Sequence, residues 1–190
     1  MNRTGWIALI AAMLVSAVPT AIEAHITPAV TLRTQADVIR TFLPNAVKYK
    51  ATTVRISKAQ FAAIASRAHY TPESDAVKFY SGEDASGHTV GTVVFPQVDT
   101  QHGPVEVGVV IDPAGKVEAV SVTRVTVEMK PWMMEAERSG VFDQLKGTSA
   151  ADSPKEIAKG ALTGMPGYMA DVVAAAAFRG LQLFSTLRPA

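Results

Sequence analysis

Hydrophobic positions recur with helical spacing in the first part of the chain. Four apolar residues share one side of a short helix: Ala36, Ile39, Phe42 and Leu43. Thr34 can cap this helix, and Pro44 ends it. A second helix follows Ser57, whose spacing to Gln60 is that of a capping box. Its apolar stripe has the expected helical period and consists of Phe61, Ile64, Ala65 and Ala68. Residues 48–56 lie between the two helices and read as a first strand.

From Ala76 onward the hydrophobic period changes to two, which is typical of strands. Short strands are predicted at about 76–81 and 89–95. Strict alternation over 104–111 predicts a half-buried antiparallel strand, whose apolar side consists of Val105, Val107, Val109 and Ile111. Asp112–Gly115 then has the proline and glycine positions of a type I turn, so a hairpin partner must follow.

The partner strand changes parity partway along its length. Val120 and Val122 continue one parity, whereas Val125 and Val127 take the other. One extra residue in a strand produces such a change, so a β-bulge is predicted near 123–124, at Thr123 and Arg124.

The remainder of the chain reads as helical. The predicted segments are a helix over 132–145, a loop over 147–154, a helical turn over 155–161 and a break at Gly164-Met165-Pro166-Gly167. Pro131 suits the first turn of the first of these helices, and Gly140 weakens it. A final helix is expected to hold Asp171 in its first turn and to end near Leu187. Its surface is almost entirely apolar, so it should pack deep in the domain.

These elements together predict an α+β fold: a twisted, mainly antiparallel sheet with packed helices. At 190 residues the chain is long enough to bury a sizeable core but short for two independent domains. No internal repeat or low-complexity block interrupts it. A single domain is therefore expected over residues 25–190.

The first 24 residues have the layout of a secretory signal peptide. Arg3 precedes a small-or-apolar run from Trp6 to Val18 that only Ser16 interrupts. The run is shorter than the ~20 residues that cross a bilayer comfortably, and Pro19 and Ala24 supply a helix break and a small residue before a cut. We therefore expect export to the periplasm with cleavage after Ala24. An uncleaved N-terminus that holds the protein at a membrane is the alternative.

Composition and motifs mainly exclude function classes. With 18 basic and 17 acidic residues the net charge is +1, which argues against nucleic-acid binding because phosphate neutralisation needs a basic excess. The absence of cysteine excludes disulfides, Fe–S clusters, thiol catalysis and tetrathiolate zinc. No nucleophile-elbow, Walker or dinucleotide motif marks catalytic residues. The class of enzyme, if any, is therefore left open at this stage.

The four histidines lack the spacing of a metal site. They are His25, His69, His88 and His102, and they read as solvated loop residues. His25 differs because cleavage after Ala24 would make it N-terminal, where its amine and imidazole nitrogens can chelate Cu(II). A functional copper site there needs at least one further histidine.

Residues 103–184 carry the most informative order of segments. A hairpin with the sequence GPVEVGVVIDPAGKVEAVSV is followed by VEMKPWM, by FDQLKG and by a glycine-containing segment that opens the final helix. This order resembles the FMN-binding domain of the flavin-bearing subunits of the Rnf complex and the Na⁺-translocating NADH:quinone reductase. Glu128–Pro131 is similar to a Glu-Thr-Pro-Gly-type segment of that family. The resemblance extends loosely upstream, so it implies an FMN-binding-domain-like fold for the mature chain.

The family attaches FMN by a phosphoester to the last threonine of Asp-x-x-Ser/Thr-Gly-Ala-Thr. The best gapless match here is Gly160-Ala161-Leu162-Thr163-Gly164-Met165-Pro166. Thr163 and Gly164 keep the motif, whereas Gly160 and Met165 depart from it and Pro166 stands at the acceptor position. Because proline has no hydroxyl, the resemblance here implies FMN that is bound without a covalent bond.

The candidate cofactor-binding residues follow from this resemblance and from simple chemistry. They are Glu128, Lys130, Trp132, Lys159, Thr163, Gly164, Met165, Gly167 and Tyr168. Glycines allow close approach of the backbone, and amides at a helix N-terminus favour a phosphate. Trp132 and Tyr168 offer flat faces to an isoalloxazine ring, and Lys130 and Lys159 offer charge. The alternative is ordinary core packing for the aromatic residues and methionines, and solvated charge for the lysines.

The expected function is that of an exported FMN-binding protein that passes electrons among envelope redox partner proteins. In this hypothesis the flavin carries out the redox chemistry, and the protein positions it. An alternative is the same fold without cofactor, acting as a binding or scaffold module. A copper site at His25 is the third hypothesis.

Overall fold

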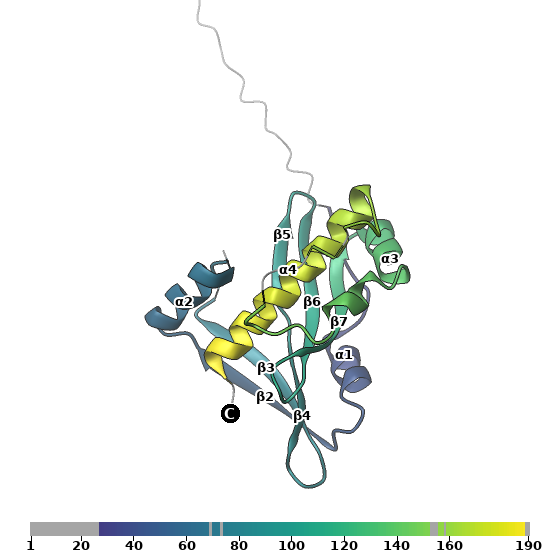
Figure 1. The fold of residues 1–190 in the computed structure, drawn as a ribbon. Helices are drawn as coiled ribbons and strands as arrows, with labels where there is room; N and C mark the ends of the chain where they lie inside the picture. Colours follow the sequence, from purple (N-terminus) through teal and green to yellow (C-terminus); the bar gives the residue numbers. More distant parts are fainter. Residues whose placement is uncertain (1–26, 69, 73, 153–155, 158, 189–190) are drawn as a thin grey trace, which may run out of the picture.

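A seven-stranded, mainly antiparallel sheet that does not close on itself organises the fold (Figure 1). The computed structural model describes residues 27–188 apart from 69, 73, 153–155 and 158, and these counts refer to that part of the chain. The elements are β1 (Ala29–Thr31), α1 (Gln35–Phe42), β2 (Lys48–Arg55), α2 (Lys58–Ala68), β3 (Ala76–Glu83), β4 (Thr89–Val94), β5 (Gln97–Thr100), β6 (Gly103–Ile111), β7 (Val117–Thr126), α3 (Lys130–Arg138), a 3₁₀ helix (Val141–Leu145) and α4 (Gly164–Leu187). This architecture confirms the predicted α+β fold.

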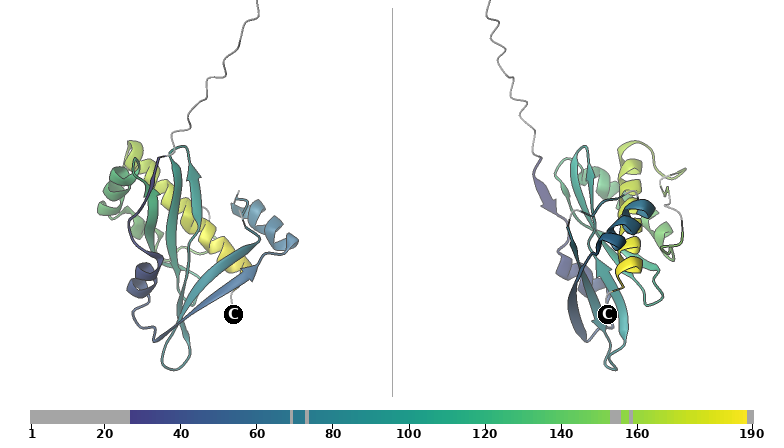
Figure 2. Two further views of the ribbon diagram at one scale, coloured as in Figure 1. Left: turned by 180° about the vertical axis from the view of Figure 1, so that it is seen from behind. Right: turned by 90° about the vertical axis from the view of Figure 1, so that its left-hand side faces the viewer.

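Helices cover both faces of the sheet, as the side view in Figure 2 shows. The long helix α4 crosses one face, with α3 beside its first half and α2 beside its second half. A large core fills the space beneath it and includes Phe79, Val107, Val109, Met133, Val173 and Leu181. The short helix α1 covers part of the opposite face, over a smaller core of Val38, Ile39, Leu43, Val93 and Val110. The sheet order is β1-β7-β6-β4-β3-β2, with β5 paired to β6.

Both predicted N-terminal helices form where their caps indicate. Thr34 is the N-cap of α1, and its Oγ1 accepts a hydrogen bond from the Asp37 backbone N–H at 3.1 Å. At α2 the Gln60 backbone N–H donates to Ser57 Oγ at 3.3 Å, and the Ser57 N–H donates to Gln60 Oε1 at 3.0 Å. Gln60 Nε2 also donates to the Thr186 carbonyl at 3.4 Å, which ties α2 to the end of α4.

The Thr34 cap provides a first testable prediction. The Thr34 hydroxyl donates to the Asp37 carboxylate at 2.6 Å, and this bond lowers the pKa of that carboxyl below its usual value of 3.8. Thr34→Ala should lower the free energy of unfolding by about 1 kcal/mol at neutral pH. A carboxyl with a lowered pKa stabilises the fold above its unfolded-state pKa, and this contribution is lost as pH falls through the folded-state pKa. Urea denaturation should therefore show that Thr34→Ala lowers the free energy of unfolding by less at acidic pH than at neutral pH. An equal loss at acidic and neutral pH would contradict the hydrogen bond between Thr34 and Asp37.

The antiparallel strand predicted over 104–111 forms as β6, but the prediction that it is half-buried is wrong for its second half. Every residue from Val107 to Ile111 is buried, including those that point away from α4. The reason is α1, which packs on that second face: a Cβ built on Gly108 would lie 2.8 Å from Val38 Cγ1 and 2.9 Å from Phe95 Cε1. The glycine therefore lets α1 approach the sheet closely.

The hairpin after β6 forms as predicted, together with its bulge. The Gly115 N–H donates to the Asp112 carbonyl at 2.9 Å across the turn. Thr123 is the extra residue of β7, because Glu106 lies opposite Arg124 while Val107 lies opposite Val122. A second shift of register near the turn leaves Glu118 as another extra residue, which the valine pattern did not indicate.

The single helix predicted over 132–145 is also wrong. The chain forms α3 only as far as Arg138 and then a separate 3₁₀ helix from Val141. Gly140 divides them, because its φ of 74° lies in the left-handed region that interrupts a right-handed helix. Pro131 does lie in the first turn of α3, as expected.

The predicted break at Gly164–Gly167 is part of α4, which starts at Gly164, so Asp171 lies beyond its first turn. Pro166 fits there because the first turn of a helix does not need its N–H groups for internal bonds. In place of the helical turn predicted over 155–161, residues 159–161 form a turn and 156–157 have no regular structure. The end of α4 at Leu187 and its deep burial are confirmed.

The sheet opens between β3 and β5. Strands β4 and β5 pair with β6 in one constant register, from Thr92 opposite Ile111 to Thr100 opposite Gly103. Strand β3 pairs with β4 only as far as Phe79 opposite Val94. Residues 76–78 of β3 remain paired with β2 but do not pair with β5. A gap in the sheet results, and α4 crosses in front of it in the view of Figure 1.

The proposed signal peptide, its cleavage after Ala24, His25 and His69 all lie outside the described residues. Within the described part of the chain, no helix combines the length and apolar character needed to cross a bilayer.

Candidate functional site

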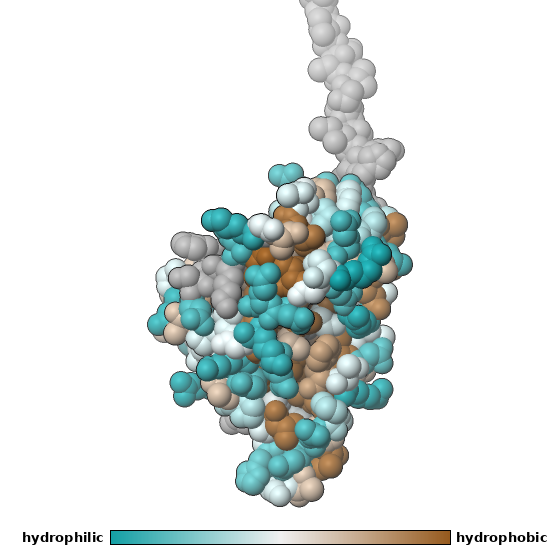
Figure 3. Space-filling view, turned by 45° about the vertical axis from the view of Figure 1, so that its right-hand side comes forward, coloured by the Kyte–Doolittle hydropathy of each residue, from teal (hydrophilic) through white to brown (hydrophobic). Residues whose placement is uncertain are grey.

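A surface hollow of about 450 Å³ lies at the start of α4. Four of the predicted cofactor-binding residues line it: Lys159, Gly164, Gly167 and Tyr168. Tyr168 is exposed, as is Lys159. The space-filling view of this side shows hydrophobic side chains gathered in its upper half beside the grey atoms (Figure 3). The structure therefore brings together nearly half of the predicted site in one hollow.

The N-terminus of α4 is open to an anion. Thr163 is its N-cap, but its side chain makes no capping hydrogen bond, and the first turn contains no acidic residue. The first backbone N–H groups of a helix have no partner within it, and the helix dipole is positive at this end. Pro166 removes one of these donors, which leaves the N–H groups of Gly164 and Met165 as the available ones.

The hollow is lined by side chains of both charges. Lys159 supplies one positive charge, while Glu156 and Asp171 also line the hollow. The two carboxylates oppose an anion near them. A ligand that suits this hollow therefore carries its anionic group against the helix terminus and has a neutral body elsewhere.

Gly164 has a specific backbone role at this terminus. Its φ of 62° lies in the left-handed region, and a Cβ built there would meet nothing within 4 Å. Because Gly164 lines the hollow, a side chain at this position would both strain the backbone and extend into open space. A substitution at Lys159 is therefore a cleaner test of ligand binding than one at Gly164.

Glu128 and Trp132 belong to a second group, gathered around His102. His102 Nδ1 lies 3.1 Å from Glu128 Oε1, and its ring meets that of Trp132 edge to face at 5.9 Å between centroids. His102 is held by its backbone, since Thr126 Oγ1 donates to its carbonyl at 3.0 Å. The interpretation of His102 as an unengaged loop residue is thus incomplete, whereas His88 is an exposed turn residue beside Asp84.

The contact between His102 and Glu128 was not predicted from the sequence, because it depends on both extra residues of β7. With the bulge placed at Thr123, Glu106 lies opposite Arg124. Continuing that register to the end of the hairpin sets His102 opposite Glu128. The parity change of the valines indicates only one of the two extra residues of β7 and by itself would set His102 opposite Val127. The extra residue at Glu118 completes the register.

The remaining predicted residues have separate surroundings. Lys130 is exposed at the first residue of α3, and Thr163 is exposed at the N-cap of α4. Met165 is half-buried and packs against the large core, as does Trp132. Packing against the core therefore accounts for the half-burial of Met165 and Trp132.

No protein-family model, curated protein or solved structure matches this chain. Within residues 27–188, where described, no three His, Cys, Asp or Glu side chains converge to hold a metal ion.

Proposed function

We propose that the protein binds FMN without a covalent bond at the start of α4. The observation that carries this proposal is the helix N-terminus without a side-chain cap, beside the hollow that Lys159 and Tyr168 line. The donor set there fits a phosphate: two backbone N–H groups and one ammonium group. The FMN phosphate would bind these donors, and its neutral ring system suits the rest of the hollow.

Each residue of the hollow has a distinct part in this function. Lys159 and the first N–H groups of α4 bind and orient the phosphate. Tyr168, which is 42% exposed, offers an aromatic surface to the ring. The bound flavin supplies the redox chemistry, and the chain supplies position and electrostatics. As an exported protein it would exchange electrons with partner proteins of the periplasm and cell envelope.

We predict that FMN is not attached covalently, even when a flavin transferase is coexpressed. Pro166 stands at the acceptor position and has no hydroxyl. Intact-mass measurement of the purified protein should therefore show the mass of the chain without a covalent flavin. An added FMN mass on a peptide within 155–170, where Thr163 is the only Ser or Thr, would show that Thr163 is the acceptor.

Reversible binding is tested by titrating FMN and following its fluorescence. We expect saturable quenching, and we expect Lys159→Gln to weaken binding by about 2- to 5-fold, the range of an exposed charge pair. Lys146→Gln removes the same charge from another exposed lysine and should leave the affinity unchanged. Wild-type protein that produces no quenching at millimolar FMN would overturn the proposal.

A binding module without cofactor is the second candidate function. The gap between β3 and β5 favours it, because it forms a pocket of about 360 Å³ far along α4 from the hollow. A pocket of this size is within the range of small-molecule sites.

A further inference from the structure

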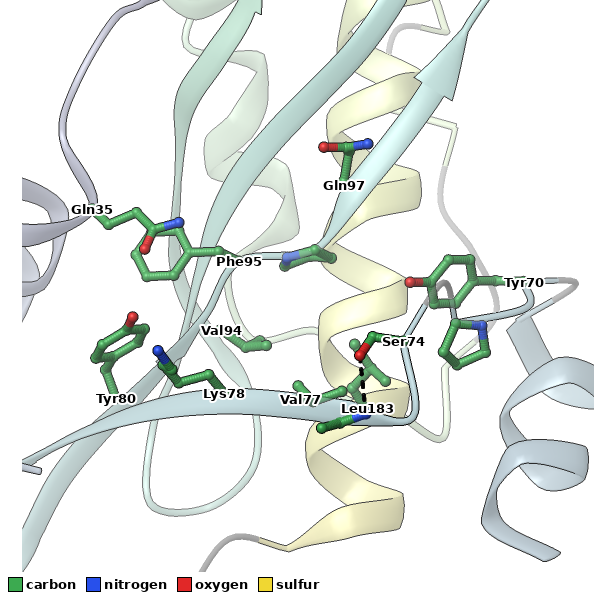
Figure 4. A pocket seen from close by; sticks show the side chains of 13 residues that line it. Gln35, Tyr70, Ser74, Val77, Lys78, Tyr80, Val94, Phe95, Gln97 and Leu183 are labelled. Carbon is green, nitrogen blue, oxygen red and sulfur yellow. Dashed lines mark hydrogen bonds between the residues drawn. The ribbon is translucent and has the colours of Figure 1, made fainter. Parts of the chain in front are cut away.

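The gap between β3 and β5 is a pocket that residues from both faces of the sheet line (Figure 4). Gln35 of α1 borders it on one face of the sheet, and Leu183 of α4 borders it on the other. Leu183 is 19 residues beyond Gly164, which corresponds to roughly 28 Å along a helix at 1.5 Å per residue. The pocket is therefore separate from the hollow proposed for FMN.

Main-chain groups of both strands point into this gap. The Ile56 N–H donates to the Asp75 carbonyl at 2.7 Å, which shows that odd-numbered residues of β3 bond to β2. The neighbouring residue Lys78 therefore directs its N–H and C=O toward the gap. On the other side the Val107 N–H donates to the Pro96 carbonyl at 3.1 Å, so Phe95 and Gln97 direct theirs away from β6 and toward the gap.

Side chains cap two of the backbone groups that would otherwise join β3 to β5. Ala76 and Gln97 would be opposite each other if the β3–β4 register continued. Instead the Ala76 N–H donates to Ser74 Oγ at 3.2 Å, and Arg179 Nη1 donates to the Gln97 carbonyl at 2.8 Å. Arg179 also lies over the Tyr70 ring, 4.3 Å from its centroid. These contacts satisfy the backbone with the two strands apart, so the open gap is a stable arrangement.

The chemistry of the pocket is apolar at its floor and cationic at its mouth. Val94 and Leu183 are buried on the floor, and Val77 lies beside them. Among the described lining residues Lys78 is the only charged one. Figure 4 shows its side chain rising from β3 toward Tyr80 and Phe95. Arg179 adds a second positive charge next to Gln97.

We propose that this pocket binds a small organic carboxylate with an apolar body. The carboxylate pairs with the Lys78 ammonium group, and the N–H groups of Lys78 and Phe95 that face the gap are available to donate to it. The apolar body packs against the half-buried Val77 and Phe95, which removes apolar surface from water. Such a ligand also keeps β3 and β5 apart. This inference does not depend on flavin binding.

The first test uses 4-phenylbutanoate, with the neutral 4-phenylbutanol as its matched partner. Calorimetry should give a Kd of about 1 mM for the acid, as expected for a ligand of this size. The alcohol should bind about 5-fold more weakly because it lacks the charge. Equal affinities, or no saturable binding of the acid at concentrations about tenfold above that Kd, would overturn the proposal.

Variants and NMR then locate the site. Lys78→Gln should weaken binding of the acid by about 2- to 5-fold and leave binding of the alcohol unchanged. Lys116→Gln, at an exposed lysine outside the pocket, should change neither. Amide shifts on titration should concentrate at Lys78, Phe95 and Gln97, and saturating FMN should not displace the acid. Shifts confined to the start of α4, or an unchanged affinity in Lys78→Gln, would show that the pocket is not the site.

Discussion

Phe79→Ala is expected to lower the free energy of unfolding by about 3–5 kcal/mol, the usual cost of removing a fully buried aromatic ring. Phe79 has no exposed surface and packs edge to face against Phe184 of α4, with 6.4 Å between ring centroids. It also forms, with Val94, the last β3–β4 pair before the gap. Its removal thus leaves a cavity at the point where β3, β4 and α4 meet.

Urea denaturation of the wild type and the variant measures this loss. Phe79→Leu is the matched control, because it keeps most of the apolar volume and should cost about 1 kcal/mol. A value for Phe79→Ala within 1 kcal/mol of the wild type, by the same order-of-magnitude scale, would contradict the packing of Phe79 between the sheet and α4.

Gly180→Val should produce the second large effect, a loss of about 1–3 kcal/mol from overpacking. A Cβ built on Gly180 would lie 3.0 Å from both Cβ and Cγ2 of Val109, so α4 touches β6 at this point with no space between them. The two further methyl groups of valine must displace either the helix or the strand. Denaturation in urea, with circular dichroism at 222 nm as the probe, measures the change.

Gly180→Ala is the control for this variant. Alanine gains up to about 1 kcal/mol of helix propensity over glycine, which offsets the tight contact of its single methyl group. We therefore expect its stability to stay within about 1 kcal/mol of the wild type. A valine variant as stable as the alanine variant would show that α4 does not pack closely against Val109 at Gly180.

The sequence predicted most elements because their determinants are local. The capping boxes at Thr34 and Ser57, and the alternation along β6, depend on residues a few positions apart. The burial of β6 on both faces was not predicted because it depends on the packing of α1, whereas the errors in the helices arose where one residue decided between two local structures. Gly140 adopts a left-handed conformation and divides a helix, whereas Pro166 is accommodated in the first turn of α4.

The same distinction explains what was predicted of the candidate site. Lys159, Gly164 and Tyr168 are near each other in the chain, so one loop and one helix start bring them to the same hollow. The contact of His102 with Glu128 joins residues 26 positions apart and required the register of the whole hairpin. The gap between β3 and β5 had no local indication, because it depends on how far two distant strands stay paired.

The short β3–β4 pairing has a consequence for local unfolding. Strands β4, β6 and β7 are bonded to neighbours on both sides, whereas β2 and residues 76–78 of β3 are bonded to the rest of the sheet only through Phe79–Glu83. A unit attached by so few pairs opens with less free energy than the whole domain. We expect amide hydrogen exchange in β2 to proceed by local detachment of β2 from the rest of the sheet together with β3, well before the amides of β6 exchange.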